Sequence, residues 1–178
     1  MMFLFTASPK IGSKAIRWAL SEPCSHFAIC FDESESGMGI VFHSTFSGVK
    51  FDWFNHFYRH NKIVYALKPK LNSLQLEERV YQSIVRRHYG RDYDKRAFCA
   101  FAYFALRRKF TGSPIPRSES FGSPNNYLCT ELGVSLKELC PEFVPKDLPL
   151  ELISPYSLYQ NMLHSKELEN VPWIARRI

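Results

Sequence analysis

The chain has 178 residues, 46% of them hydrophobic, which is enough to bury a core, and we predict one domain over residues 1–178. No apolar run reaches the roughly 18 residues that a transmembrane helix needs. The start, MMFLFTASPKIG, lacks the basic leader and the apolar length of a signal peptide, so we expect a cytoplasmic protein. The net charge of +6 suits anionic partners, but the basic clusters at 86–87, 107–109 and 176–177 are scattered, and a solvated surface explains each.

The cysteines do not show the pattern of a disulfide-stabilised protein. There are five, an odd number, and their spacing is not paired. At least one of them must therefore remain a thiol. They are Cys24, Cys30, Cys99, Cys129 and Cys140.

The first half of the chain is predicted to form strands after a short helix. SKAIRWAL (13–20) is typical of a helix that begins at Ser13. SHFAICFD and IVFHSTF are rich in strand-forming residues, and ESESGMG between them supplies turn residues, which predicts an antiparallel hairpin. GVKFDWFNHFY is interpreted as a connection with a helical turn. The predicted strands span 25–32, 40–46 and 62–69, the last closed by Pro69.

The second half of the chain is predicted to be helical. SLQLEERVYQSIVRRHYG places its apolar residues on one helical face, between Ser73 as a cap and Gly90 as a stop. Ser154 followed by Pro155 suits the start of the last helix. Strands and helices are segregated, which favours an α+β fold with a small antiparallel sheet packed against helices. The predicted helices span 73–90, 92–110, 127–139 and 154–163, with a Pro-, Gly- and Ser-rich loop at 111–126.

Cys129 in NNYLCTEL is the first candidate for chemistry. Asn125 or Asn126 can cap the predicted helix, which puts Cys129 in its first turn. There the helix dipole and the N–H groups stabilise a thiolate and lower the thiol pKa, and the same N–H groups can bind an oxyanion. The alternative is a buried apolar cysteine, which is the commoner role of this residue type.

Two histidines on the predicted hairpin are the candidate partners of Cys129. His26 lies in the first strand of the hairpin and His43 in the second, so both imidazoles can share one face of the sheet. A cysteine, a histidine base and a second polar group form a nucleophile–base–orienter arrangement. Taken alone, a histidine in an apolar strand is more often a core residue whose hydrogen bonds are satisfied.

A metal site competes for the same side chains. Cys24, His26 and Cys30 alternate to one side of an ideal strand, and His43 could be a fourth ligand. Structural zinc sites usually pair close ligands in two short knuckles, and this set does not. We therefore expect no metal.

The order of several short stretches resembles a known superfamily. They are CSHFAICF, IVFHSTFSGVKFDWF, YGRDYD, YLCTEL and SPYSLYQ, between residues 24 and 162. Together they resemble the circularly permuted branch of the NlpC-type papain-like superfamily, which includes the lecithin–retinol acyltransferase-like proteins. The chain differs from that pattern in two respects. LFTASPKIGSKAIRW replaces the GD turn before the family's first strand, and Thr130 replaces a frequent Ser.

The resemblance implies a permuted papain-like fold, in which a helix with a nucleophilic Cys at its N-terminus packs on a His-bearing antiparallel sheet. It implies Cys129 as nucleophile, His26 as base and His43 as the orienting residue of a peptidase, amidase or acyl transferase that cleaves an amide or ester bond. Candidate substrates are peptidoglycan peptides, lipid acyl groups and protein side-chain amides, and no cofactor is implied. Two other classes stay open, a non-catalytic binding module on the same fold and a basic nucleic-acid-binding domain.

Overall fold

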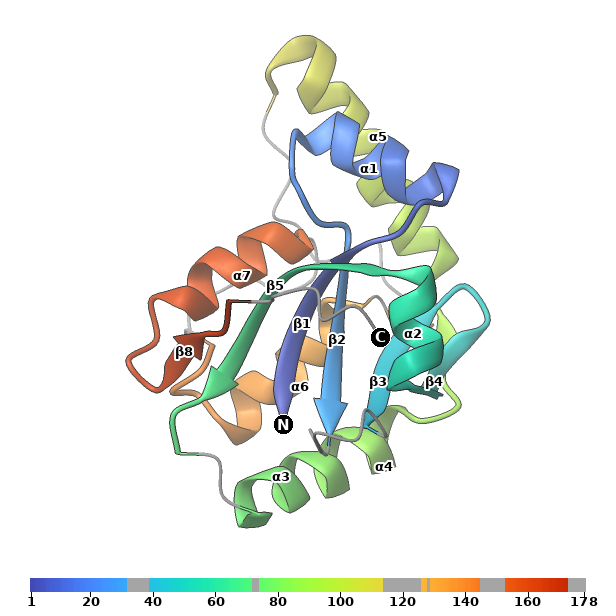
Figure 1. Ribbon diagram of the computed structural model, residues 1–178. Helices are drawn as coiled ribbons and strands as arrows, with labels where there is room; N and C mark the ends of the chain where they lie inside the picture. Colours follow the sequence, from blue (N-terminus) through green and yellow to red (C-terminus); the bar gives the residue numbers. More distant parts are fainter. Residues whose placement is uncertain (32–38, 72–73, 114–125, 128, 145–152, 173–178) are drawn as a thin grey trace.

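The computed structural model describes residues 1–31, 39–71, 74–113, 126–127, 129–144 and 153–172. A six-stranded sheet lies at its centre in the order β4-β3-β2-β1-β5-β8, and every neighbouring pair of strands is antiparallel (Figure 1). The architecture is therefore α+β, as the segregated pattern predicts. In chain order the elements are β1 (Met2–Ala7), α1 (Ile11–Leu20), β2 (His26–Phe31), β3 (Ile40–Thr45), β4 (Gly48–Trp53), α2 (Phe54–His60), β5 (Lys62–Pro69), α3 (Leu74–Val80), the π-helical segment η1 (Tyr81–Val85), α4 (Arg86–His88), β6 (Asp92–Tyr93), α5 (Lys95–Thr111), β7 (Asn126–Tyr127), α6 (Glu131–Leu139), α7 (Pro155–Leu163) and β8 (Leu168–Asn170).

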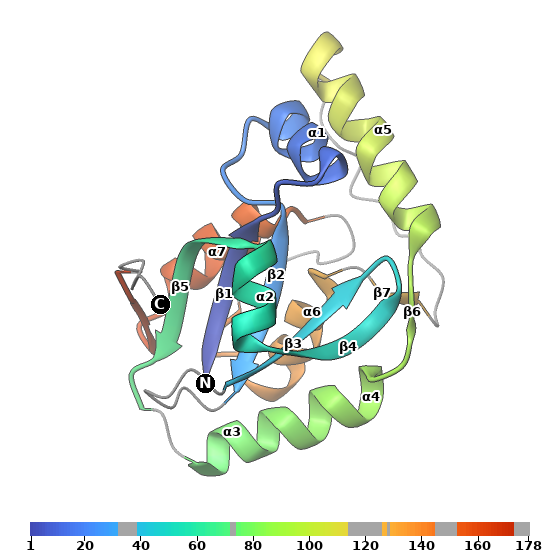
Figure 2. The same cartoon turned by 45° about the vertical axis from the view of Figure 1, so that its right-hand side comes forward.

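Different helices cover the two faces of the sheet, because successive side chains of a strand point to opposite faces. On one face α2 buries Phe54 and Phe57 against strand residues such as Ala28. On the other face, residues of α3, α6 and α7 pack with strand residues such as Phe27 and Phe42. Figure 2 shows α2 in front of the sheet and α6 behind it. The sheet is thus the middle layer, and any site at its end is accessible to residues from both sides.

Several predicted elements are confirmed. β2 and β3 form the predicted antiparallel hairpin, with Ala28 opposite His43. β5 has the predicted bounds of 62–69. Ser154 caps α7, because its side chain accepts a hydrogen bond of 3.0 Å from the Ser157 N–H, and Pro155 occupies the first turn.

Two six-residue strands of the central sheet were not predicted, and neither were the short strands β6, β7 and β8. Met2–Ala7 forms β1, which lies between β2 and β5 and is buried along its whole length. A strand covered on both faces is apolar at most positions, so it lacks the alternation that identifies a strand in sequence. Gly48–Trp53, interpreted as part of a connection, forms β4 and pairs with β3.

The helix starts also differ from prediction. α1 begins at Ile11 with Lys10 at its N-cap, and the Ser13 hydroxyl instead accepts a hydrogen bond from the Ser8 N–H. α5 begins at Lys95, because the buried carboxylate of Asp94 accepts a bond of 2.7 Å from the Ala97 N–H. The helix predicted over 73–90 contains the π-helical segment η1, and its predicted cap, Ser73, lies outside the described residues.

Gly48 provides a test of this architecture. Its φ is +108°, and a Cβ there would lie 2.9 Å from the Arg91 carbonyl oxygen. That carbonyl accepts a bond of 2.8 Å from the Val49 N–H, so it cannot move away freely. We expect Gly48→Ala to lower the free energy of unfolding by about 1 to 3 kcal/mol in urea titrations. Gly12→Ala in α1, where a Cβ meets nothing within 4 Å, should be neutral or raise it by up to about 1 kcal/mol. Equal losses in both variants would contradict this explanation.

Candidate active site

Three side chains on neighbouring strands form a continuous chain of hydrogen bonds. His26 Nε2 lies 3.1 Å from His43 Nδ1, and His43 Nε2 lies 3.0 Å from Asp52 Oδ2. The strand register produces this arrangement. His43 is directly opposite Ala28 on β2 and Lys50 on β4, so His26 and Asp52 are its diagonal neighbours on the same face. The predicted pairing of the two imidazoles is therefore confirmed, and Asp52 extends it.

The hydrogen-bond chain determines which nitrogen atoms carry protons. An ionised Asp52 can only accept, so His43 must donate through its Nε2–H. A neutral His43 then has a lone pair on Nδ1, which accepts the Nε2–H of His26. In this state the lone pair that remains on the two imidazoles belongs to Nδ1 of His26. His26 is thus the member of the chain that can accept a proton from another group.

The charges around the chain agree with this assignment. Burial lowers the pKa of His43 to about 4, although the hydrogen bond and the charge of Asp52 oppose the shift. Burial, His43 and Lys10 lower the pKa of His26 to about 3. Burial alone would raise the pKa of Asp52, but hydrogen bonds from His43 and Lys50 outweigh it and hold that pKa below its ordinary value. At neutral pH the chain therefore consists of a carboxylate and two neutral imidazoles.

Phe57 of α2 holds the two imidazoles in place. Its ring centroid lies 5.0 Å from that of His43, with the rings nearly perpendicular, and 6.3 Å from that of His26. His43 is 4% exposed, whereas His26 is only partly buried. The aromatic contact restricts the rotation of both rings, and the exposed part of His26 lies at the beginning of β2.

Cys129 lies beside the segment that leads into β2. It is 8% exposed, and its thiol is close enough to Cys24 to contribute to the raised pKa of that residue. Burial is the largest cause of that shift, and the Glu22 charge is the next. Cys24 precedes His26 by two residues. The structure thus brings His26 and His43 together, and Cys129 is near enough to Cys24, two residues before His26, to affect the pKa of Cys24.

The start of the helix after Cys129 corrects the sequence prediction. α6 begins at Glu131 with Thr130 at its N-cap, so Cys129 is in the turn before the helix and not in its first turn. Asn126, one of the two predicted caps, lies in β7 and pairs with Asp92 of β6, and Asn125 lies outside the described residues. Asn126 and Tyr127 are therefore part of a strand and not of the helix that was predicted to begin there.

The alternative zinc ligands do not lie on one side of β2. Cys24 precedes the strand and belongs to the core cluster on the α6 side, whereas Cys30 belongs to the cluster under α2. The alternation expected of an ideal strand therefore does not extend to Cys24. Within the described ranges, no group of three or more His, Cys, Asp and Glu side chains is arranged to hold a metal ion.

Asp52 is the site residue that sequence analysis missed. It was missed because GVKFDW was interpreted as a connection rather than as a strand. The signal was present, since Lys50 and Asp52 alternate with Val49 and Phe51 in the way that a strand with one polar face requires. As part of a third strand next to His43, Asp52 would have been a candidate partner.

The buried histidine makes stability depend on pH. The pKa of His43 is about 4 in the folded protein and about 6.5 in an unfolded chain. Between these values the unfolded chain binds a proton at His43 that the folded protein does not, so His43 alone should make the free energy of unfolding fall by up to about 1.4 kcal/mol for each pH unit that the pH is lowered through this window. Urea titrations at a series of pH values measure this slope. The pKa values of His26 and His88 are also lowered, to about 3 and about 4, so these residues add to the same slope. His43→Gln should therefore reduce the slope by the share of His43, and an unchanged slope would show that His43 does not contribute.

Comparisons with known proteins establish a likeness of fold. No family model matches the chain, and no curated protein sequence matches it significantly. Among solved structures, the fold is similar to that of the metalloprotein yiiX from Escherichia coli O157:H7, described as DUF1105. The two chains are 18% identical, the match covers 96% of this chain and 94% of that one, and the TM-score is 0.51. No helix in the described part of this chain is long and apolar enough to cross a membrane.

Proposed function

We propose that the protein is a thiol-dependent hydrolase or acyl transferase of the permuted papain-like class, acting on an amide or ester bond. Cys129 is the nucleophile, His26 the base, and His43 and Asp52 the groups that orient His26. The observation that carries this proposal is the hydrogen-bonded chain from Asp52 through His43 to His26. Buried polar groups cost free energy unless they are bonded, and this chain leaves a lone pair at its partly exposed end, which is what a base requires.

In the proposed reaction, Nδ1 of His26 accepts the thiol proton of Cys129 while the sulfur attacks the carbonyl carbon of the substrate. His43 accepts the Nε2–H of the protonated His26, and the charge of Asp52 stabilises the positive charge on the imidazoles. The proton passes to the leaving group, and water or another acceptor then removes the acyl group from the sulfur. N–H groups around the turn at Cys129 are the candidates for oxyanion binding.

The low pKa of His26 affects when the proton moves. A thiol ordinarily has a pKa near 8.5, so an imidazole with a pKa of about 3 does not take its proton in the resting protein. In the proposed mechanism, proton transfer from Cys129 to His26 therefore accompanies the attack. Because α6 and α2 pack on opposite faces of the sheet, the proposal requires Cys129 and His26 to meet at the end of β2 and not across the middle of a sheet face.

An acylating ester tests the proposal. p-Nitrophenyl acetate should transfer its acetyl group to Cys129 and release p-nitrophenolate, which is followed by absorbance, and peptide mass spectrometry should locate the acetyl group. The exposed Cys99 serves as the internal control, since Cys99→Ser should leave the burst of p-nitrophenolate unchanged. A burst that disappears in Cys99→Ser and persists in Cys129→Ala would overturn the proposal.

A binding module on the same fold is the second candidate, and the burial of Cys129 favours it. A thiol that is 8% exposed, next to the fully buried Cys24, is accessible to substrate only after some movement of its surroundings. For a binding module, the same experiment should give no acetylation of Cys129 in the folded protein, while denaturation in urea should expose Cys129 to the reagent.

A further inference from the structure

Helices α1 and α5 form a pair that projects from the sheet, and we call it the helical arm. The two helices pack against each other, and Figures 1 and 2 show the pair beyond the end of β1 and β2. The pair buries Ile16 and Ala19 of α1 and Phe101 and Ala105 of α5. Because these small and apolar side chains are used for the contact within the arm, the outer side of each helix is left for other contacts.

The outer side of the arm is apolar and aromatic. On α5, Tyr103 is 61% exposed, Leu106 42% and Phe110 75%, and the exposed Cys99 precedes them. Their spacing of four, three and four residues places them in one stripe along the helix. On α1, Ile11 is 86% exposed and Trp18 55%. The ring of Trp18 lies 6.1 Å from that of Phe110, so the two helices contribute to one continuous surface.

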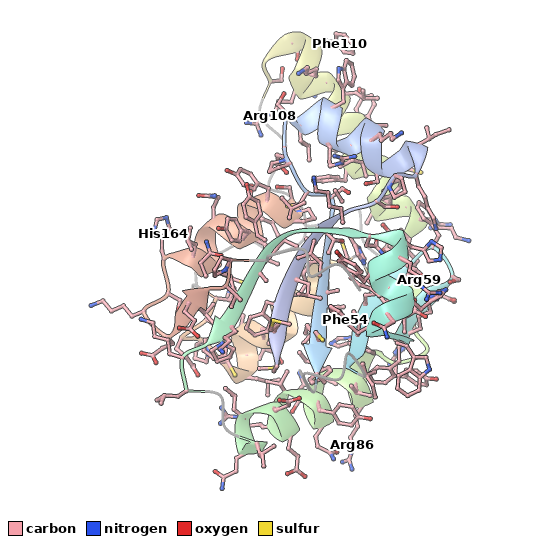
Figure 3. The ribbon with its side chains drawn as sticks, in the orientation of Figure 1. Phe54, Arg59, Arg86, Arg108, Phe110 and His164 are labelled. Atoms are coloured by element: carbon pink, nitrogen blue, oxygen red, sulfur yellow. The ribbon has the colours of Figure 1, made fainter. Side chains whose placement is uncertain are left out.

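Every charged side chain on the two helices is basic. Residues 11–20 and 95–111 contain no Asp or Glu. The cation of Lys109 lies 5.5 Å from the centre of the Trp18 ring, so positive charge and aromatic surface are interleaved. Figure 3 shows Arg108 and Phe110 near the far end of α5, on different sides of the helix. The basic residues of the two helices are Lys14, Arg17, Lys95, Arg96, Arg107, Arg108 and Lys109.

We propose that the helical arm docks on an anionic lipid surface. Lipid phosphates attract the Lys and Arg side chains, the Trp and Tyr rings suit the headgroup region, and Leu106 and Phe110 enter the acyl boundary. This proposal is independent of the function proposed for Cys129.

The composition of the arm argues against two other occupants. A second copy of α5 would bring one helix whose charged residues are all basic against another, so like charges repel. A nucleic acid would use the cations and the aromatic rings, but Ile11 and Leu106 have no ring on which a base can stack. An anionic bilayer uses both the cations and the aliphatic side chains.

Sedimentation with vesicles tests the proposal. The chain should bind vesicles of equal parts phosphatidylglycerol and phosphatidylcholine, and bind phosphatidylcholine alone weakly. Arg96→Gln with Arg107→Gln should reduce the partition coefficient roughly five-fold for each cation removed. Leu106→Ser with Phe110→Ser should reduce it by at least as much.

Matched controls lie at the other end of the molecule. Arg86→Gln and Leu74→Ser change an exposed cation and an exposed leucine of α4 and α3, and Figure 3 shows Arg86 at the end opposite Phe110. Both should bind as the wild type does. Three results would overturn the proposal: no sedimentation with the anionic vesicles, equal losses in the controls, or a dimer in size-exclusion chromatography that Leu106→Ser with Phe110→Ser converts to a monomer.

Discussion

Cys129→Ala is expected to abolish acetylation by p-nitrophenyl acetate, and His26→Ala to slow it by about a hundred- to ten-thousand-fold, the usual contribution of a positioned base. Both changes disable the same step, because the thiol cannot attack efficiently without losing its proton. The double variant should therefore be no slower than Cys129→Ala. Stopped-flow absorbance gives the rates, and circular dichroism shows whether each variant is folded. Acetylation of Cys129 at the wild-type rate in His26→Ala would remove His26 as the base.

The other cysteines provide a scale for the reactivity of Cys129. Burial raises the pKa of Cys24 to about 12 and also raises that of Cys140, so both should react slowly with iodoacetamide near pH 7. Cys99 is exposed and should react as an ordinary surface thiol. We expect Cys129 to react faster than Cys99 despite its burial, because the imidazole of His26 can accept its proton during attack. A rate equal to or below that of Cys99 would contradict a nucleophilic role.

Asp52→Asn should reduce the rate of Cys129 acetylation by about 10- to 100-fold, the effect that loss of a hydrogen-bond partner has at metal-bound histidines, because Asp52 orients His26 only through His43. The change also removes the charge that raises the pKa of His43, so that pKa should fall below its value of about 4. The amide can still accept the His43 Nε2–H, so the chain of hydrogen bonds can survive the loss of charge. Histidine nitrogen shifts in NMR titrations measure the pKa and the tautomer directly.

Lys50→Gln is the matched control for Asp52→Asn. The charge of Lys50 lowers the pKa of His43, so its removal should raise that pKa, opposite to the effect of Asp52→Asn. Lys50 contacts the same carboxylate, with its Nζ 3.2 Å from Oδ2 of Asp52. If both variants shifted the pKa of His43 in the same direction, a change in packing rather than charge would be the cause.

The part of the site that could be predicted depends on local patterns. The hairpin over β2 and β3 has strand-forming residues on each side of a turn, and a period of two then places His26 and His43 on one face. Asp52 could be predicted as a site residue only if β4 was recognised as a strand. It was not, because β4 continues directly into α2 and the two were interpreted as one connection. The position of Cys129 depends on the pairing of β6 with β7, whose residues are more than thirty positions apart and carry no local signal for each other.

The prediction of the fold failed for a related reason at β1. The residues MFLFTA are buried because neighbouring strands flank them and helices cover both faces of the sheet. That environment comes from β2 and β5, which are distant in the sequence, so the segment could not be distinguished from any other short apolar run. The permuted connection of the papain-like class stays a prediction from the order of motifs.

The two edges of the sheet affect whether strands of other copies of the protein can pair with it. At one edge β8 covers only the last part of β5, from Leu67 to Pro69, where Lys68 and Glu169 place opposite charges 3.6 Å apart. At the other edge, the Gly90 N–H and the Arg91 carbonyl bond to Val49 of β4. An outer strand with unused N–H and C=O groups is a template for adding strands from other molecules. A short outer strand with paired charges at one edge and a loop bonded to Val49 at the other leave less of each edge open, which lowers the tendency of the sheet to add strands from other molecules.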